Sequence, residues 1–331
     1  MFRYDRDIFI HSLGLWLDAR RKKAFSFVSH AHGDHTGAHD RILATPATLA
    51  LASERACIRR EILGLRSPRR APGEMPVEFG EKIELDGATV TLYPAGHILG
   101  SAQILIEHDG GSLLYSGDFC PENAAAAEGI EIPHAETLIM ECTYGLPEHK
   151  FPPRKKVIED LYKFIDKTLA EDRTPMVFCY ALGKGQEVAH LLGMKGYRVA
   201  AERETWRLAK VYERFGVEFG DLRCLDSPVQ PGEVMVIPSW PQATPYLDGR
   251  RVRTAAATGW VTGGFYSRTA RTDARIALSD HADFPGLLKY IEAVAPKTVY
   301  IVHGPSEFAY YVKKAGFEVR PITEKQASRV L

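Results

Sequence analysis

The run His30-Ala31-His32-Gly33-Asp34-His35 constrains this chain more than any other part of its sequence. It follows residues 24–29, an apolar segment with the length and composition of a buried strand. Three imidazoles and a carboxylate in six positions are poor core material, and a chance cluster is improbable in a chain with 12 histidines. In an extended or turning segment the first two histidines can project to one side while the last two residues reach a neighbouring position. One strand end can therefore serve two metal ions.

The mixture of imidazole nitrogen and carboxylate oxygen suits zinc, manganese or iron(II), whereas magnesium favours oxygen ligands alone. The five cysteines form no C-x-x-C pair, so neither a disulfide framework nor a thiolate zinc knuckle is indicated. A reducing compartment fits this pattern best. The segment Met1 to Asp7 has acidic residues where a signal peptide would be cationic, and no apolar stretch reaches membrane length. We expect a cytoplasmic protein with no membrane partner.

Further ligands are expected at other strand ends, because the first run alone cannot close two metal sites. His97 follows the apolar segment 88–93 between two glycines that permit a tight turn. Asp118 follows the segment 112–115, and His303 follows the segment 298–302. A single histidine beside glycine is more often a turn residue, but the three together with the first run complete a two-metal set.

The periodicity predicts mostly strands in the first half of the chain, with a helix over residues 45–63 and a basic, Pro/Gly-rich loop over residues 67–76. Between about residues 150 and 275, strands alternate with helices, which favours a small α/β unit with a parallel sheet. From Arg275 the pattern is again strand, helix and strand, over residues 275–278, 284–295 and 298–302.

Net charge gives no support to a polyanionic partner, since 42 Lys and Arg balance 42 Asp and Glu. A nucleic acid would have to be held by local basic clusters. Candidate clusters occur at Arg59-Arg60, residues 66–70, residues 154–156, residues 250–253, and Arg268 with Arg271 and Arg275. A solvated surface is the simpler interpretation of each cluster taken alone.

The order Asp18, His30-x-His32-x-Asp34-His35, His97, Asp118 resembles the metallo-β-lactamase superfamily. Glu141 in Glu141-Cys142-Thr143, His281 in Ser279-Asp280-His281 and His303 in Val302-His303-Gly304 resemble the three additional motifs of the β-CASP nucleases. The resemblance covers almost the whole chain and is greatest to the bacterial DNA-ligase-associated exonucleases, relatives of the Artemis-type DNA repair nucleases. It implies an αββα sandwich from residues 1–149 and 276–331, with residues 150–275 as an inserted α/β domain with a parallel sheet, the β-CASP domain.

The resemblance also implies two divalent cations, Zn²⁺ or alternatively Mn²⁺. The first would be held by His30, His32 and His97. The second would be held by Asp34, His35 and His303, and Asp118 would bridge both. Two such cations lower the pKa of a water between them and neutralise charge that develops on phosphoryl oxygens.

Three more residues receive roles from the same resemblance. Asp18 would orient a ligating histidine, because such histidines usually need a partner for the second ring nitrogen. His281, an imidazole that titrates near neutral pH, would donate a proton to the leaving group, and Glu141 would orient it. The ordinary alternatives are a surface histidine at position 281 and a strand-end ion pair at position 141.

These features predict a metal-dependent nuclease, and we favour a DNA exonuclease in DNA repair, with a DNA ligase and a helicase as partners by resemblance. A histidine at the last motif, here His303, is typical of RNA-processing members, so an RNA nuclease of the 3′-end processing or decay type is the alternative. A thioester or lactone hydrolase of the same fold is a remote third, since it would not need Glu141 and His281. Lys184, between a strand and a helix in Gly183-Lys184-Gly185, is a tentative contact to the substrate backbone. A plain βα turn competes there, because the P-loop spacing is absent.

Overall fold

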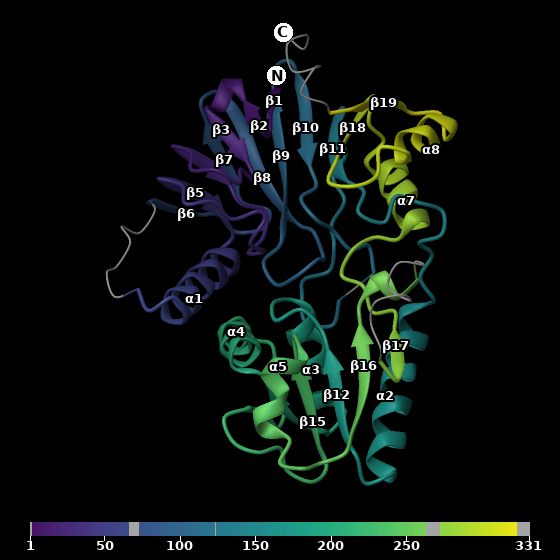
Figure 1. Cartoon of the computed structure of the whole chain (residues 1–331). Coiled ribbons are helices and arrows are strands. Elements are labelled where there is room, and N and C mark those ends of the chain that lie inside the picture. Colours follow the sequence, from purple (N-terminus) through teal and green to yellow (C-terminus); the bar gives the residue numbers. More distant parts are fainter. Residues whose placement is uncertain (1, 66–72, 123, 263–271, 323–331) are drawn as a thin grey trace. The chain divides into compact units, whose positions relative to one another are not determined.

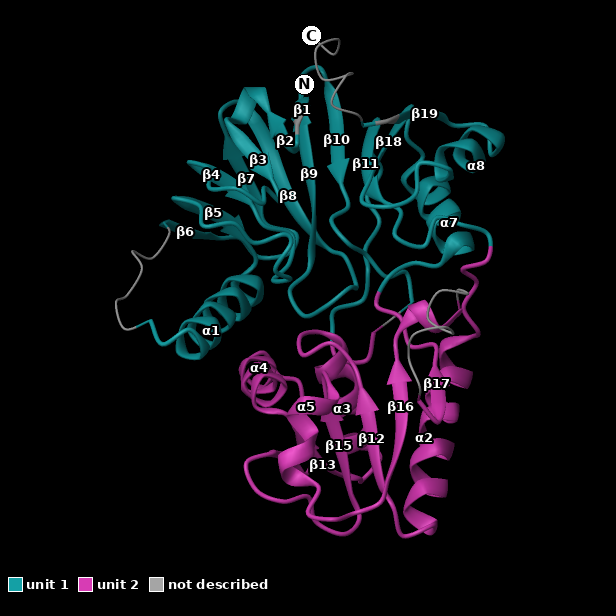
Figure 2. Ribbon diagram, in the orientation of Figure 1, with its two compact units in different colours: residues 1–123, 127–147, 281–331 teal, residues 124–126, 148–280 magenta. Residues whose placement is uncertain are grey.

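The structure is a computed structural model that describes residues 2–65, 73–122, 124–262 and 272–322. The chain divides into two compact units, coloured separately in Figure 2. Unit 1 comprises residues 1–123, 127–147 and 281–331, and unit 2 comprises residues 124–126 and 148–280. The basic residues Arg66 to Arg70, Arg268 and Arg271 lie outside the described residues.

Unit 1 contains a six-stranded sheet whose strands follow sequence order. These strands are β1 (Phe2–Asp5), β2 (Asp7–Ile10), β3 (Leu15–Leu17), β4 (Phe25–Phe27), β5 (Arg41–Ala44) and β6 (Gly73–Pro76), with a 3₁₀ turn η1 at His11–Leu13. Helix α1 (Pro46–Ile62) begins at Thr45, whose hydroxyl accepts from the Thr48 amide, and Pro46 occupies the first helical position. Leu49 of this helix packs against Ala44 and Val28 on the same sheet.

The second sheet of unit 1 has seven strands in the order β19-β18-β11-β10-β9-β8-β7. Their bounds are β7 Lys82–Leu85, β8 Ala88–Pro94, β9 Ala102–His108, β10 Gly111–Tyr115, β11 Thr137–Glu141, β18 Thr298–Val302 and β19 Glu318–Pro321. Helices α7 (Phe284–Val294) and α8 (Phe308–Lys314) lie on this sheet (Figure 1).

The side chains of β11 point alternately to the two faces of its sheet and show what covers each face. Ile139 belongs to the core between the two sheets, whereas Leu138 and Met140 pack with Leu287 and Tyr290 of α7. Successive side chains of a strand point to opposite faces, so a strand buried on both sides reads as a continuous apolar run. The second sheet is thus covered by the first sheet on one face and by helices on the other. The expected αββα sandwich is confirmed.

Unit 2 is a parallel six-stranded sheet in the order β14-β13-β15-β12-β16-β17. The strands are β12 (Thr174–Phe178), β13 (Arg198–Ala201), β14 (Leu222–Cys224), β15 (Glu233–Ile237), β16 (Val252–Ala257) and β17 (Ala274–Ile276). The helical segments are α2 (Arg154–Ala170), α3 (Lys184–Met194), α4 (Arg203–Arg214), α5 (Trp240–Ala243), η2 (Thr244–Tyr246) and η3 (Gly259–Thr262). The predicted α/β unit with a parallel sheet is confirmed.

Two details differ from the sequence-based expectations. The predicted loop over residues 67–76 ends in strand β6, which pairs with β5 at the edge of its sheet. Pro76 fits this strand because one side of an edge strand has no partner and needs no amide hydrogen there. The strand that begins near Arg275 pairs with β16 and belongs to unit 2. We keep the domain limits at residues 149/150 and 275/276 as a proposal.

Within the described ranges, no helix combines the length and the apolar character that a membrane crossing requires.

Candidate metal centre

The candidate residues follow strands whose ends meet along one edge of unit 1. Asp18 comes directly after β3 and the His30–His35 run comes after β4, and these two strands are parallel neighbours. In the second sheet, β10, β11 and β18 are parallel neighbours that lead into Asp118, Glu141 and His303. Parallel strands end at the same edge of a sheet, so residues far apart in the sequence come together here.

Asp18 is a buried acceptor that fixes the first run. Its Oδ1 accepts from the Ser29 amide at 2.7 Å, and its Oδ2 accepts from the Ser29 hydroxyl at 2.5 Å and from the Tyr115 hydroxyl at 2.8 Å. The same Oδ2 lies 2.8 Å from Nδ1 of His35. This bond occupies one nitrogen of the ring and turns Nε2 toward Asp118, whose Oδ2 is 3.3 Å away. Burial disfavours charge on His35, but Asp118 and Asp18 raise its pKa well above the usual value.

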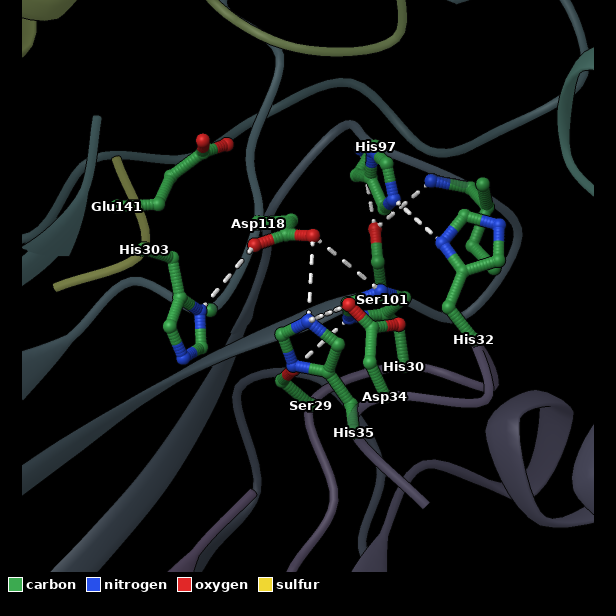
Figure 3. A network of polar contacts seen from close by, with 12 residues as sticks. Ser29, His30, His32, Asp34, His35, His97, Ser101, Asp118, Glu141 and His303 are labelled. Atoms are coloured by element: carbon green, nitrogen blue, oxygen red, sulfur yellow. Dashed lines mark hydrogen bonds and ion pairs between the residues drawn. The ribbon is translucent and has the colours of Figure 1, made fainter. Parts of the chain in front are cut away.

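His30, His32 and His97 form the first cluster (Figure 3). One ligand atom from each of these residues lies within 4.8 Å of the others, and Nε2 of His97 is 3.0 Å from Nδ1 of His32. Nδ1 of His30 is 2.9 Å from the Ser29 hydroxyl, so its Nε2 faces the cluster. Burial and the neighbouring imidazoles of His35 and His97 lower the pKa of His30 well below its usual value. The neutral ring that results is the form that donates a lone pair to a metal.

Nε2 of His30 is the observation that best tests whether a metal fits. The side chain is fully buried, and this nitrogen has no hydrogen-bond partner among the described residues. Its neighbours include Oδ2 of Asp118 at 3.6 Å, which is beyond hydrogen-bonding distance. A buried polar atom without a partner is costly, and a cation between His30, His32, His97 and Asp118 would satisfy it. The residues present therefore fit a metal at this cluster.

Glycines and Ser101 shape the loop that carries His97. The amides of His97 and Ile98 both donate to the Ser101 hydroxyl, at 3.1 and 3.2 Å. Gly96 has a φ of +75°, and a Cβ there would lie 2.4 Å from the carbonyl oxygen of Cys120. A larger residue at this position would both strain the backbone and push the loop away from the centre.

His35, Asp118 and His303 form the second cluster, again with one ligand atom of each within 4.8 Å of the others. Nδ1 of His303 lies 4.0 Å from Oδ1 of Asp118, and Oδ2 of Asp34 lies 3.7 Å from Nε2 of His35. In Figure 3 Asp118 lies between His303 and the histidines of the first cluster. Oδ2 of Asp118 thus lies near His30 of the first cluster and His35 of the second, and Oδ1 lies nearest to His303. His303 itself has a φ of +51°, a conformation that is uncommon outside glycine and that recurs at functional sites.

Glu141 and His281 form a pair beside these clusters. Nδ1 of His281 is 2.8 Å from Oε1 of Glu141, which also accepts from the Phe119 amide at 3.0 Å. Oε2 of Glu141 accepts from both the amide and the hydroxyl of Thr143. Glu141 is 1% exposed and fully engaged, so it holds the imidazole in one orientation. Asp118, Glu141 and His281 each offer a ligand atom within 4.8 Å of the others.

Lys184 lies in unit 2, at the first residue of α3. Its side chain is 1% exposed, and its Nζ is 3.4 Å from a carboxylate oxygen of Glu187 and 3.4 Å from one of Asp280. The structure thus gives this ammonium two carboxylate neighbours, and the substrate contact stays a prediction.

Two residues of the centre escaped the sequence analysis. Tyr115 reaches Asp18 across 97 positions of sequence, and Ser29 contacts both Asp18 and His30. Neither residue type ligates a metal in the sets considered, so no spacing rule selects them. The position of Tyr115 at the end of β10, three residues before Asp118, was the available signal.

The structure places two His/Asp clusters that could hold metal ions at the strand ends of an αββα sandwich. Comparisons with known proteins support a metallo-hydrolase. Residues 272–320 match the model of the Zn-dependent metallo-hydrolase RNA specificity domain. Over 328 residues the chain is 40% identical to the "Probable DNA ligase" of Opitutus terrae, covering 97% of this chain and 31% of that protein. It is 29% identical over 189 residues to "RNase aCSPSF2" of Saccharolobus solfataricus, covering 51% of this chain and 38% of that protein.

These matches support a place for the chain in the metallo-β-lactamase superfamily, among the β-CASP nucleases. It spans less than half of the length of either curated relative. Among solved structures, a protein of unknown function from Enterococcus faecalis V583 matches with a TM-score of 0.64 and 16% identity, over 90% of this chain and 78% of that one. That likeness supports the fold.

Proposed function

We propose that this protein is a two-metal phosphodiesterase that degrades DNA as an exonuclease in DNA repair. The observation that carries the proposal is the buried Asp118 carboxylate, whose Oδ2 lies between His30 of the first cluster and His35 of the second, and which lies beside the Glu141/His281 pair. A hydrolase of thioesters or lactones would not need that pair.

In this proposal the residues divide into two ligand sets that share Asp118. The first set is His30, His32 and His97, and the second is Asp34, His35 and His303. The all-His/Asp donor set suits Zn²⁺ and also accommodates Mn²⁺. When bound, the two cations would lower the pKa of a water between them and neutralise charge on the phosphoryl oxygens.

Residues of the chain would orient the metal-binding histidine His35 and protonate the leaving group. Asp18 orients His35 through Nδ1 and so presents Nε2 to the centre. Glu141 holds Nδ1 of His281, which leaves Nε2 of that ring to donate a proton to the departing oxygen. The carboxylate is aimed by two backbone amides, so it does not depend on flexible partners.

DNA is favoured as the polymer because nearly the whole chain aligns with part of a protein named as a DNA ligase. That name also supports a DNA ligase as a partner, and a helicase partner rests on the family resemblance alone. RNA is the second candidate, favoured by the RNA specificity domain match over residues 272–320 and by a relative named as an RNase. Lys184 is kept as a tentative substrate contact. A cytoplasmic location is proposed because all five cysteines are free.

The test uses DNA and RNA of one sequence, each labelled at the 5′ or the 3′ end and incubated with the protein and Zn²⁺ or Mn²⁺. We expect stepwise shortening of DNA that is faster than any loss of RNA. The Asp34→Ala plus His35→Ala variant, with an unchanged far-UV circular dichroism spectrum, should leave both polymers intact. Preferential RNA cleavage would replace DNA by the second candidate, and equal activity of the variant would refute the assigned centre.

A further inference from the structure

Helix α4 of unit 2 carries four cations along one face. Arg203, Arg207, Lys210 and Arg214 are separated by four, three and four positions. At 3.6 residues per turn these side chains fall within an arc of about 60° and extend over about 16 Å. Arg203 and Arg214 are exposed, and the other two are half-buried. We call these four residues the α4 stripe.

The opposite face of the helix fixes where the stripe points. Thr205, Leu208, Ala209, Val211 and Tyr212 are all buried. The helix contacts β14, the strand at one edge of the unit 2 sheet, and α3. Figure 1 shows α4 beside α3. An apolar face that is packed in this way holds the cations in a fixed outward row.

Helix stability does not account for the stripe. Each neighbouring pair along it has a spacing of three or four residues, at which like charges destabilise a helix. Arg203 is the first residue of α4, where the helix dipole disfavours a cation. The two carboxylates of the helix, Glu204 and Glu213, lie on opposite flanks of the stripe. Glu213 pairs with Lys210 at 2.7 Å, whereas Arg203 and Arg214 form no ion pair within the part of the chain that the structure describes.

The exposed face of α2 shows the ordinary alternative. Its lysines alternate with carboxylates, and Asp160 lies 2.6 Å from Lys156 and 3.9 Å from Lys163. Such a mixed face is typical of a solvated helix. The cluster at residues 154–156, contiguous in the sequence, is therefore partly neutralised in the structure. The α4 stripe is dispersed in the sequence, and the charges of Arg203 and Arg214 at its exposed ends are offset by no ion pair among the described residues.

We propose that the α4 stripe binds the phosphate backbone of the polynucleotide substrate, independently of base sequence. The proposal rests on the proposed nuclease function and adds the surface that holds the polymer. Consecutive phosphates repeat every ~3.4 Å along a B-form strand, so a row of this length faces several of them. Arginine suits this contact because its planar guanidinium can bond phosphate oxygens in pairs.

The test compares two variants with equal loss of charge. One carries Arg203→Gln, Arg207→Gln, Lys210→Gln and Arg214→Gln, and the control carries glutamine at Lys155, Lys156, Lys163 and Lys167 of α2. Fluorescence anisotropy measures the Kd of each for a labelled single-stranded 20-mer in EDTA, from 50 to 300 mM KCl. For single strands, each lost phosphate contact lowers the slope of log Kd against log [KCl] by about 0.7. The slope of the α4 variant should therefore be lower by about 3, and at 100 mM KCl the variant should bind on the order of 100-fold more weakly.

The α2 control should keep the wild-type slope, and so should a variant with lysine at the three arginines of the stripe, since lysine keeps the charge. Circular dichroism and thermal unfolding confirm that each variant is folded. An α4 variant with the wild-type slope would overturn the proposal, as would an equal loss in the α2 control. Hydrolysis of bis(4-nitrophenyl) phosphate with Zn²⁺ or Mn²⁺ tests the proposed function separately, because this small diester does not span the stripe.

Discussion

Each unit of this protein buries a cluster of charged groups, and the two clusters are built differently. In unit 2, two permanent cations meet two carboxylates in a network of Arg154, Lys184, Glu187 and Asp280. Arg154 also donates to the Ser279 carbonyl at 2.9 Å, and Glu187 accepts from the Ala125 amide at 3.2 Å. In unit 1, the carboxylate of Asp118 meets imidazoles that can be neutral, and Nε2 of His30 has no partner among the described residues.

This difference in composition distinguishes a cluster that stabilises the fold from a cluster that can bind metal ions. Charges in the unit 2 network offset one another within the protein, so removal of one leaves an uncompensated charge in the interior. In the unit 1 cluster the lowered pKa of His30 favours the neutral ring, and its Nε2 lone pair has no partner among the described residues, so it can bind an added cation. Mutations should therefore affect folding in unit 2 and metal binding in unit 1.

The largest effect is expected from Asp118→Ala. Loss of the carboxylate that faces both clusters should reduce bound metal below two equivalents and lower the rate of DNA hydrolysis by at least about 10³-fold, several kcal/mol in the transition state. Elemental analysis and initial rates measure the two quantities. A variant that keeps two metals and the wild-type rate would contradict the role of Asp118.

Glu187→Ala should act on stability instead. It leaves Arg154 and Lys184 with one buried carboxylate fewer, which costs about 3–5 kcal/mol in the free energy of unfolding. Urea unfolding followed by tryptophan fluorescence reports it, because Trp206, Trp240 and Trp260 all lie in unit 2. The exposed Glu159→Ala is the control and should change stability by less than about 0.5 kcal/mol. Equal stability of both variants would show that the network contributes little.

His281→Ala should slow DNA hydrolysis by about 10²–10⁴-fold, the usual range for loss of a general acid. The same variant should cleave bis(4-nitrophenyl) phosphate at close to the wild-type rate, because nitrophenolate leaves without protonation. Glu141→Gln should follow the same pattern more weakly. Equal losses on both substrates would mean that His281 does not protonate the leaving group.

Asp18→Asn should have a smaller effect on the centre than Asp118→Ala or His281→Ala. The amide fills the same space, but it weakens the bond that orients His35, and such partners typically change metal affinity or activity by about 10–100-fold. Competition with a zinc chelator measures the affinity. Tyr115→Phe, which removes one donor to the same oxygen, is the milder comparison and should lie between the wild type and Asp18→Asn. An unchanged affinity in both variants would remove Asp18 from the centre.

Much of this organisation could be predicted from the sequence, for reasons that particular residues show. Metal-binding chemistry is concentrated in the His30–His35 run, and β3, β4, β8, β10 and β18 carry enough apolar residues to mark the strand ends that follow. The helices α1, α2, α4 and α7 have spacing that the periodicity detects. The alternation of strands and helices predicts the parallel sheet of the inserted segment, and the resemblance to the metallo-β-lactamase superfamily implies the αββα sandwich.

Other features depend on contacts that no local pattern records. Strand β1 carries Arg3 and β6 contains Pro76, so neither looks like a strand until an edge or a partner is known. The bond from Tyr115 to Asp18 spans 97 positions and follows from the packing of two sheets. The α4 stripe becomes visible only when its four cations are placed on a helix, because they are not contiguous in the sequence.

The central claim is that two metal ions share Asp118. Crystals grown with Zn²⁺ or Mn²⁺, with anomalous data collected on both sides of the metal's absorption edge, test it most directly. We predict two anomalous peaks, one among His30, His32 and His97 and one beside His35 and His303, with an oxygen of Asp118 at coordination distance from each. A single peak, or peaks away from Asp118, would contradict the account.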